Sequence, residues 1–164
     1  MKNQPTIQAR RGNTPVIVMA LALIVIFAAA FMADKVHTSH GQVQIRDIRF
    51  VTQDGGLMRA LLYIPRTASP ETPVPAVVAM HGYNNTAEMQ DINAIELSRR
   101  GIVVLAFDSY AHGHSSYPDS RVNNGFVQDL GTFAALQYLK TLPYVDLSRV
   151  GMVGHSMGGS AIQD

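Results

Sequence analysis

A serine lies between two glycines near the C-terminal end of the sequence. Gly154, Ser156 and Gly158 form the pattern Gly-x-Ser-x-Gly, directly after the apolar run 149–153, which has strand character. On a sharp turn from a strand into a helix, such a serine exposes its hydroxyl above a sheet, and the glycines let the backbone turn without a Cβ clash. Residues 159–161 are small enough for the next helix to pack closely. The pattern therefore predicts that Ser156 is a nucleophile.

A second group of residues, His81-Gly82-Tyr83, follows the apolar run 76–80. At the end of a buried strand, a turn of this kind can aim backbone N–H groups at the serine. Two such donors would each stabilise the oxyanion of a tetrahedral intermediate by roughly 3 kcal/mol. We expect the N–H groups of Tyr83 and Met157 to be these donors. The residues expected to support them are His81, Gly82, Gly154, His155 and Gly158.

A serine hydroxyl is a poor nucleophile unless a base takes its proton. All six histidines of the sequence precede Ser156. The side chain of the neighbouring His155 should point away from the serine hydroxyl, and His81 belongs to the predicted oxyanion turn. We therefore expect none of the histidines present to be the catalytic base.

The segment 108–115 carries further polar side chains after another apolar run. We expect Asp108 to be an acceptor that stabilises this loop rather than a catalytic acid. His112 and His114 have a spacing that could suit two metal ligands, but the sequence offers no evident third ligand. A hydrogen-bonded loop is the preferred interpretation, and no metal site is predicted.

These residues depend on a predicted alternation of strands and helices. A hairpin is expected at the start, with its turn at 53–56. The expected strands are 43–52, 57–64, 76–80, 102–107 and 149–153, and the expected helices are 84–100 and 124–142. Gly101 and Pro143 are suited to end the two helices. The order predicts an α/β fold with a mostly parallel sheet, helices on both faces and an antiparallel hairpin at its start.

Residues 15–33 carry no charge, and as a helix they would span about 28 Å, close to the thickness of a bilayer core. Basic residues precede this segment and Asp34 follows it, which predicts a cytoplasmic N-terminus, residues 1–14, and an extracytoplasmic C-terminal part. A linker is expected at 34–42 and the globular domain at 43–164. A cleaved signal peptide with an apolar core at 16–27 is the competing interpretation.

The composition allows one globular domain, because 47% of the 164 residues are hydrophobic. The net charge of +1 gives no basic footprint, so no nucleic-acid partner is expected. The absence of cysteine excludes disulfides, zinc–thiolate sites and a thiol nucleophile.

Residues 43–164 resemble the α/β-hydrolase superfamily, in particular bacterial esterase-like, dienelactone-hydrolase-like and prolyl-peptidase-like serine hydrolases. The segments that carry the resemblance are His81-Gly82, 100–108, 111–115, 145–151 and 154–159. The resemblance implies an eight-stranded, mostly parallel sheet, a Ser-His-Asp triad and no cofactor. One departure is that Tyr110 and Ala111 stand where relatives often have arginine and glycine.

In the order typical of this superfamily, the acid and the histidine follow the nucleophile. We therefore expect the chain to be the N-terminal part of a membrane-anchored serine hydrolase that acts on a small ester or peptide through an acyl-enzyme. Its expected partners are this substrate and, through residues 15–33, the lipid bilayer. The 164-residue chain alone is expected to be inactive. The alternative is a non-catalytic membrane-anchored module that retains the fold for binding or assembly.

Overall fold

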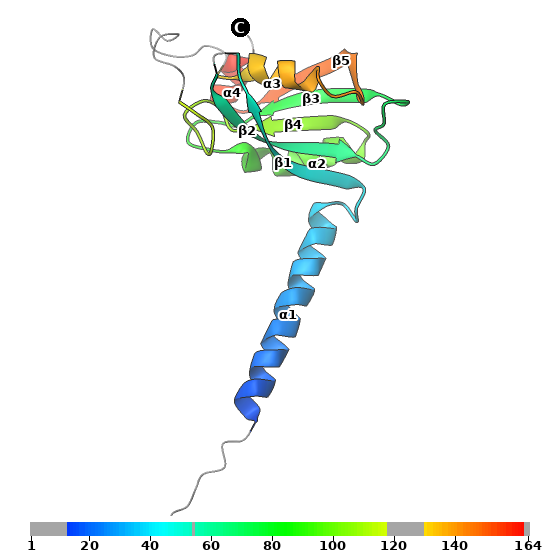
Figure 1. Ribbon diagram of the computed structural model, residues 1–164, viewed down its shortest axis with the longest axis vertical. Coiled ribbons are helices and arrows are strands. Elements are labelled where there is room, and N and C mark those ends of the chain that lie inside the picture. Colours follow the sequence, from blue (N-terminus) through cyan, green and yellow to red (C-terminus); the bar gives the residue numbers. More distant parts are fainter. Residues whose placement is uncertain (1–12, 54, 118–129, 163–164) are drawn as a thin grey trace, which may run out of the picture. The chain divides into compact units, whose positions relative to one another are not determined.

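The computed structural model describes residues 13–53, 55–117 and 130–162. The chain divides into two compact units, Met1–Val36 and His37–Asp164 (Figure 1). We call the second of these the α/β unit.

The first unit contains most of helix α1, Thr14–His37. Pro15 lies in its first turn, where the missing N–H of proline is tolerated. In the described part of the chain, α1 is the one helix long and apolar enough to cross a membrane, with a mean hydropathy of 3.0 over its most apolar window. A signal sequence near the N-terminus has the same properties, so both interpretations stand. The helix runs on into the predicted linker and stops before Ser39 and His40, whose φ angles are 50° and 60°.

The α/β unit contains a five-stranded sheet in the order β1-β2-β4-β3-β5. The strands are β1 (Val43–Val51), β2 (Leu57–Pro65), β3 (Val74–Met80), β4 (Val103–Phe107) and β5 (Val145–Gly154). The predicted hairpin is confirmed, because β1 and β2 pair antiparallel from Val43↔Pro65 to Val51↔Leu57. Strand β2 also pairs antiparallel with β4, whereas β3 pairs parallel with both β4 and β5. The described sheet is therefore mixed rather than mostly parallel, and its parallel part is formed by β3, β4 and β5. The apolar runs of β3 and β4 are buried as expected, but β5 lies at the edge of the sheet and most of its residues are exposed or half-buried.

The first predicted helix, 84–100, begins later than expected. A 3-10 turn, η1 (Ala87–Gln90), leads into α2 (Asp91–Arg99). Asn84 has a φ of 54°, and the hydroxyl of Thr86 donates to the Glu88 carboxylate at 2.6 Å instead of capping a helix. The predicted end is confirmed, because Gly101 takes a φ of 85° and its N–H donates to Ser98 O at 3.0 Å.

The prediction of one continuous helix over 124–142 is wrong. Helix α3 covers only Thr132–Leu139, and residues 118–129 lie outside the described residues. Leu130 and Gly131 have φ angles of 49° and 97°, which no α-helix accommodates. A Cβ on Gly131 would lie 2.5 Å from the Met58 methyl carbon. This close tertiary approach sets the start of α3.

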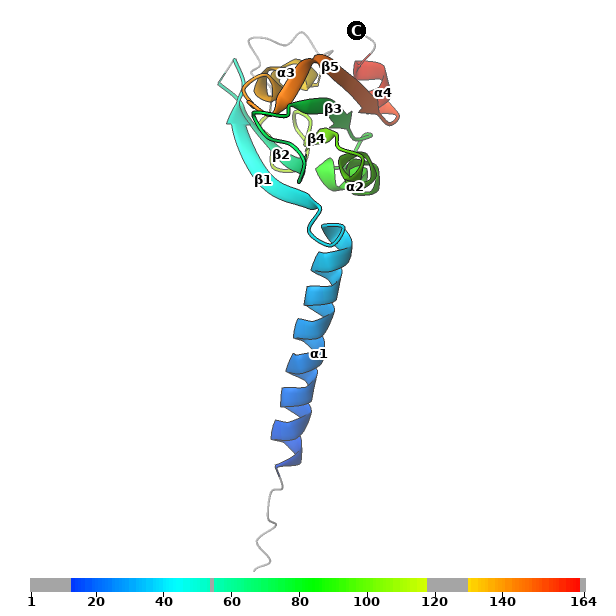
Figure 2. The ribbon, with the colours of Figure 1, turned by 90° about the vertical axis from the view of Figure 1, so that its right-hand side faces the viewer.

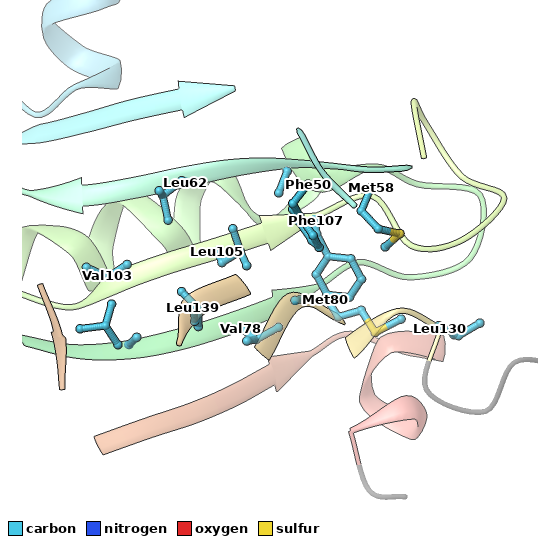
Figure 3. Close-up of a cluster of buried hydrophobic side chains, with 14 of the residues drawn as sticks. Phe50, Met58, Leu62, Val78, Met80, Val103, Leu105, Phe107, Leu130 and Leu139 are labelled. Atoms are coloured by element: carbon cyan, nitrogen blue, oxygen red, sulfur yellow. The ribbon is translucent and has the colours of Figure 1, made fainter. Parts of the chain in front are cut away.

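Two hydrophobic clusters cover the two faces of the sheet. The larger cluster contains side chains of α3 and of the short helix α4 (Met157–Ala161), and the smaller one contains Ala87 of η1 and Ala94 of α2. Figure 3 shows part of the larger cluster, where Leu62, Val78 and Leu105 of three strands lie near Leu139. Helices α2 and α3 lie on opposite sides of the strands (Figure 2), which confirms the prediction of helices on both faces.

Candidate active site

Ser156 lies on the turn between β5 and α4. Its side chain is exposed, and its backbone has φ 52° and ψ −116°. A non-glycine residue in such a conformation costs of the order of 1–3 kcal/mol and persists only where its surroundings hold it. This is the sharp strand-to-helix turn that the Gly-x-Ser-x-Gly pattern predicts.

Close backbone packing holds this turn against the end of β3. A Cβ on Gly154 would overlap the backbone of Gly158, and a Cβ on Gly158 would lie 2.7 Å from His81 O and 2.8 Å from Met80 O. The Met80 carbonyl accepts hydrogen bonds from the N–H of His155 at 3.2 Å and from Nε2 of the buried Gln90 at 2.7 Å. Glycine is therefore required at both flanking positions for steric reasons.

The substitution Gly158→Ala is expected to lower the free energy of unfolding by about 1–3 kcal/mol, the usual effect of overpacking. The added methyl group meets two carbonyl oxygens of the backbone, which cannot move away as a side chain can. Urea unfolding of the detergent-solubilised chain measures the change. Gly151→Ala is the matched control, because its Cβ would first meet Val77 Cγ2 at 3.9 Å. Equal stability of the two variants would contradict this account of the turn.

The turn after β3 lies beside the serine. A Cβ on Gly82 would be 3.6 Å from Ser156 Cβ and 3.0 Å from His155 Nδ1. Within the described residues, the N–H groups of Tyr83 and Met157 donate to no protein acceptor. The structure thus brings together Gly82, His155 and Ser156, and leaves both predicted oxyanion donors available on the adjoining residues.

His81 is fully buried and uses both ring nitrogens. Nε2 accepts a hydrogen bond from the Ser109 N–H at 3.0 Å, so Nδ1 carries the proton and donates to Gly82 O at 2.7 Å. This bond fixes the peptide between Gly82 and Tyr83. Because a trans peptide directs its C=O and N–H in opposite directions, the Tyr83 N–H points away from the Gly82 carbonyl. No sequence pattern indicated a role for Ser109; its position after a strand end was the available signal.

Acidification is expected to destabilise the α/β unit through His81. Burial lowers the pKa of His81 below its ordinary value of 6.5, so the unfolded chain takes up a proton at a higher pH than the folded chain does. The stabilisation is fully present above pH 6.5 and declines as the pH falls below it. Urea unfolding on both sides of pH 6.5 should show that the free energy of unfolding decreases as the pH falls. His81→Gln should remove this pH dependence, whereas the change at the exposed loop residue, His114→Gln, should retain it. An unchanged pH dependence in His81→Gln would contradict the assignment.

Asp108 stabilises its loop, as predicted. Its fully buried carboxylate accepts hydrogen bonds from the N–H of Ala87 at 2.8 Å and of His114 at 2.9 Å. The Ser115 hydroxyl donates to the Asp108 carbonyl at 2.6 Å. These bonds tie the segment after β4 to η1, beside the candidate site.

A buried arginine that no sequence motif indicates completes this arrangement. The side chain of Arg59 is 8% exposed and lies 2.9 Å from Asp47, 2.7 Å from Glu88 and 3.6 Å from Asp108. Its hydrogen bond holds the pKa of Asp47 below the ordinary range. Burial alone would lower the pKa of Arg59, but the surrounding carboxylates raise it, so the guanidinium stays charged. The only signal in the sequence was one charge within the apolar run of β2.

The other two loop histidines do not contact the serine. His112 Nδ1 lies 2.8 Å from Tyr110 O, and its ring is 5.1 Å from that of His81 and 5.7 Å from that of Tyr83. His114 Nδ1 lies 3.9 Å from the Asp108 carboxylate. In the described part of the chain, no histidine is hydrogen-bonded to the Ser156 hydroxyl, and no group of three or more side chains of the metal-ligating types could hold a metal ion.

Comparison with known proteins agrees with this geometry. A family model described as serine aminopeptidase, S33 (Hydrolase_4) matches residues 71–163, more than half of the chain. An uncharacterized protein of Escherichia coli K12, YcjY, is 28% identical over 113 residues, which cover 65% of this chain and 37% of that protein. The thiohydrolase apmlB of Arthrinium phaeospermum is 30% identical over 117 residues, which cover 70% of this chain and 36% of that protein.

Solved structures show the same fold. Acetyl xylan esterase 1 from Thermoanaerobacterium superposes with a TM-score of 0.59 at 22% identity, over 72% of this chain and 42% of the esterase. At this level of identity the likeness concerns the fold alone. The chain spans little more than a third of the length of the two curated relatives above.

Proposed function

Because the chain belongs to the serine aminopeptidase (S33) family of α/β hydrolases, we propose that Ser156 is the nucleophile of a serine hydrolase. One observation above all supports this role. The exposed Ser156 combines a φ of 52° with a ψ of −116° at the end of β5, the strained strand-to-helix turn that is typical of a hydrolase nucleophile.

The proposed reaction is acyl transfer through a covalent intermediate. Ser156 Oγ attacks the carbonyl carbon of an ester or amide while a histidine accepts its proton. The oxyanion that forms accepts hydrogen bonds from the N–H groups of Tyr83 and Met157. The histidine then protonates the leaving alcohol or amine, and water hydrolyses the acyl-enzyme by the same route. In this proposal the histidine and its acidic partner lie outside residues 1–164.

The proposed substrate is a small ester or peptide. The names of two similar proteins, an acetyl xylan esterase and a thiohydrolase, favour testing short acyl esters and thioesters before amides. Purified product of the complete reading frame that contains these residues should release nitrophenol from nitrophenyl acetate. The 164-residue chain should remain at the background rate because it lacks the base.

The alternatives predict different results in the same assay. Hydrolysis of an aminoacyl anilide without hydrolysis of the acyl ester or a thioester would assign the protein to peptidases. A complete product that cleaves none of these substrates would contradict the proposal as stated and favour a non-catalytic module. Reading the coding sequence beyond Asp164 gives an independent check, because further strand–helix units with an acid and a histidine are expected there.

We also propose that α1 anchors the protein in a membrane, with the α/β unit outside the cytoplasm. The length and apolarity of α1 support this, as do the basic residues before it. A reporter enzyme that is active only outside the cytoplasm, fused after Gly41, should give a signal. Silence of this fusion would overturn the orientation. The mass of the mature protein would separate an uncleaved anchor from a signal peptide.

A further inference from the structure

A basic pocket with a volume of about 580 Å³ lies at the end of the sheet opposite to Ser156. Pro65, the last residue of β2, and Gly101, just before β4, are among its lining residues. The serine and its neighbours follow the carboxyl ends of β3 and β5. Because β4 runs five residues between the two ends, roughly 17 Å of strand separates the pocket from the candidate site.

The pocket carries an excess of positive charge. Arg66, Arg99 and Arg100 line it, and none of its lining residues is acidic. One carboxylate, that of Glu96, is shared by Arg99 and Arg100, each at 2.7 Å. In the described part of the chain the exposed guanidinium of Arg66 has no hydrogen-bond or ion-pair partner. The three arginines and Glu96 therefore give the site a net positive charge, and the guanidinium of Arg66 remains free. A guanidinium is the side-chain group that best matches a phosphate.

Two further features of the pocket wall suit an anion. Ser98 lines the pocket, and its hydroxyl is the buried side-chain polar atom that has no hydrogen-bond partner in the described part of the chain. The C-terminal end of α2 would by itself repel an anion. Two of its last carbonyls are already bonded, however, because the N–H groups of Arg100 and Ile102 donate to Leu97 O and the N–H of Gly101 donates to Ser98 O.

Chain connectivity limits how far this pocket can lie from the apolar helix. Gln42 lines the pocket and is separated from Ala33, the end of the uncharged segment, by few residues. An extended chain covers at most about 3.5 Å per residue, so this segment reaches roughly 30 Å. The linker therefore allows the pocket to reach the surface of a membrane that α1 crosses. Each arginine held close to such a surface raises the affinity of the protein for anionic lipids about fivefold.

We propose that this pocket binds the phosphate of an anionic phospholipid headgroup at the membrane surface. Such contact would turn the end of the sheet that bears Ser156 toward the aqueous phase, so the substrate would be water-soluble rather than a membrane lipid. The proposal rests on the proposed membrane anchoring and does not depend on catalysis by Ser156.

Hydrogen exchange of the full chain in lipid nanodiscs tests the proposal. The chain is reconstituted in phosphatidylcholine alone or in a mixture with phosphatidylglycerol, and exchange is followed in peptides that cover 64–68 and 96–102. We expect exchange of these peptides to be about fivefold slower or more in the anionic discs. Arg66→Gln/Arg100→Gln, which leaves the Arg99–Glu96 pair intact, should abolish the difference. Arg49→Gln/Arg149→Gln removes the same charge from exposed positions outside the pocket and should retain it.

Each alternative outcome identifies what fails. Protection by inorganic phosphate added to phosphatidylcholine discs, equal to that by phosphatidylglycerol, would replace the lipid by a soluble phosphate. Equal loss of protection in both double variants would show that the protection comes from the overall positive charge and not from the pocket, and would overturn the proposal. No difference between the two kinds of disc would overturn it as well. A chain that does not co-purify with discs at all would refute the anchoring on which the proposal rests, whereas none of these outcomes bears on Ser156.

Discussion

Replacing Ser156 by alanine is expected to abolish covalent labelling of the complete protein by a fluorophosphonate probe. The probe reacts with a serine hydroxyl whose proton is taken by a base and whose negatively charged adduct is stabilised by the oxyanion donors. Loss of the nucleophile from such a site lowers kcat by about 10⁶-fold. Gel fluorescence of the labelled protein measures the first effect, and ester hydrolysis measures the second.

The neighbouring Ser160 provides the matched control. It is exposed on α4, one helical turn after Ser156, and the change Ser160→Ala should leave labelling intact. The 164-residue chain should remain unlabelled, because no described histidine is bonded to the Ser156 hydroxyl. Equal labelling of wild type and Ser156→Ala would remove this serine from the mechanism.

The elements around the serine could be predicted because their signals are local. The apolar runs of β3 and β4 contain no polar residue and are bounded by glycine, proline or a polar loop, as expected for strands covered on both faces. The Gly-x-Ser-x-Gly pattern likewise encodes its own conformation, since Gly154 is needed where α4 approaches the end of β5 and Gly158 is needed where α4 approaches the end of β3. The local sequence alone therefore sufficed to predict the turn, the exposed hydroxyl of Ser156 and the adjoining position of His81-Gly82.

The start of α3 could not be predicted from the apolar pattern, because the chain turns left-handed at Leu130 and Gly131, beside a residue that is distant in sequence. The periodic apolar pattern over 124–142 favours one helix, and the residues in this range that oppose it are Gly125 and Gly131. The backbone of Gly131 takes a left-handed conformation where the chain approaches Met58 of β2. Helical periodicity reports which face of a segment is apolar but not where a neighbouring strand interrupts it.

The residues that support the site escaped prediction for the same reason. Ser109 is bonded to His81, which is 28 positions earlier in the sequence, and Arg59 pairs with a carboxylate far along the chain. Neither residue type has a spacing signature for such a role. Together they form a continuous series of contacts in which β2 and η1 hold the loop after β4, and this loop holds His81 and the turn after β3. The positions of the predicted donors thus depend on buried polar groups that lie outside every motif.

Replacing Arg59 by methionine is expected to lower the free energy of unfolding by about 3–5 kcal/mol, the effect of removing one partner from a buried ion pair. Methionine fills a similar volume, but it leaves the fully buried Asp108 carboxylate without its neutralising cation. The facing Arg49, which is exposed and 3.9 Å from Asp47, gives the matched control, and Arg49→Met should change stability little. Urea unfolding measures both variants.

The pH dependence of this effect separates lost charge pairing from lost packing. Hydrogen bonding to Arg59 lowers the pKa of Asp47, and for Glu88 burial is outweighed by hydrogen bonds from Thr86 and Arg59, which lower its pKa too. Carboxylates with lowered pKa values stabilise the folded state above their ordinary values of 3.8 and 4.5, and this stabilisation disappears as the pH falls through the folded-state values. The difference between wild type and Arg59→Met should therefore narrow below about pH 4. A difference that stays constant through that range would assign Arg59 a packing role and leave the loop after β4 without its electrostatic support.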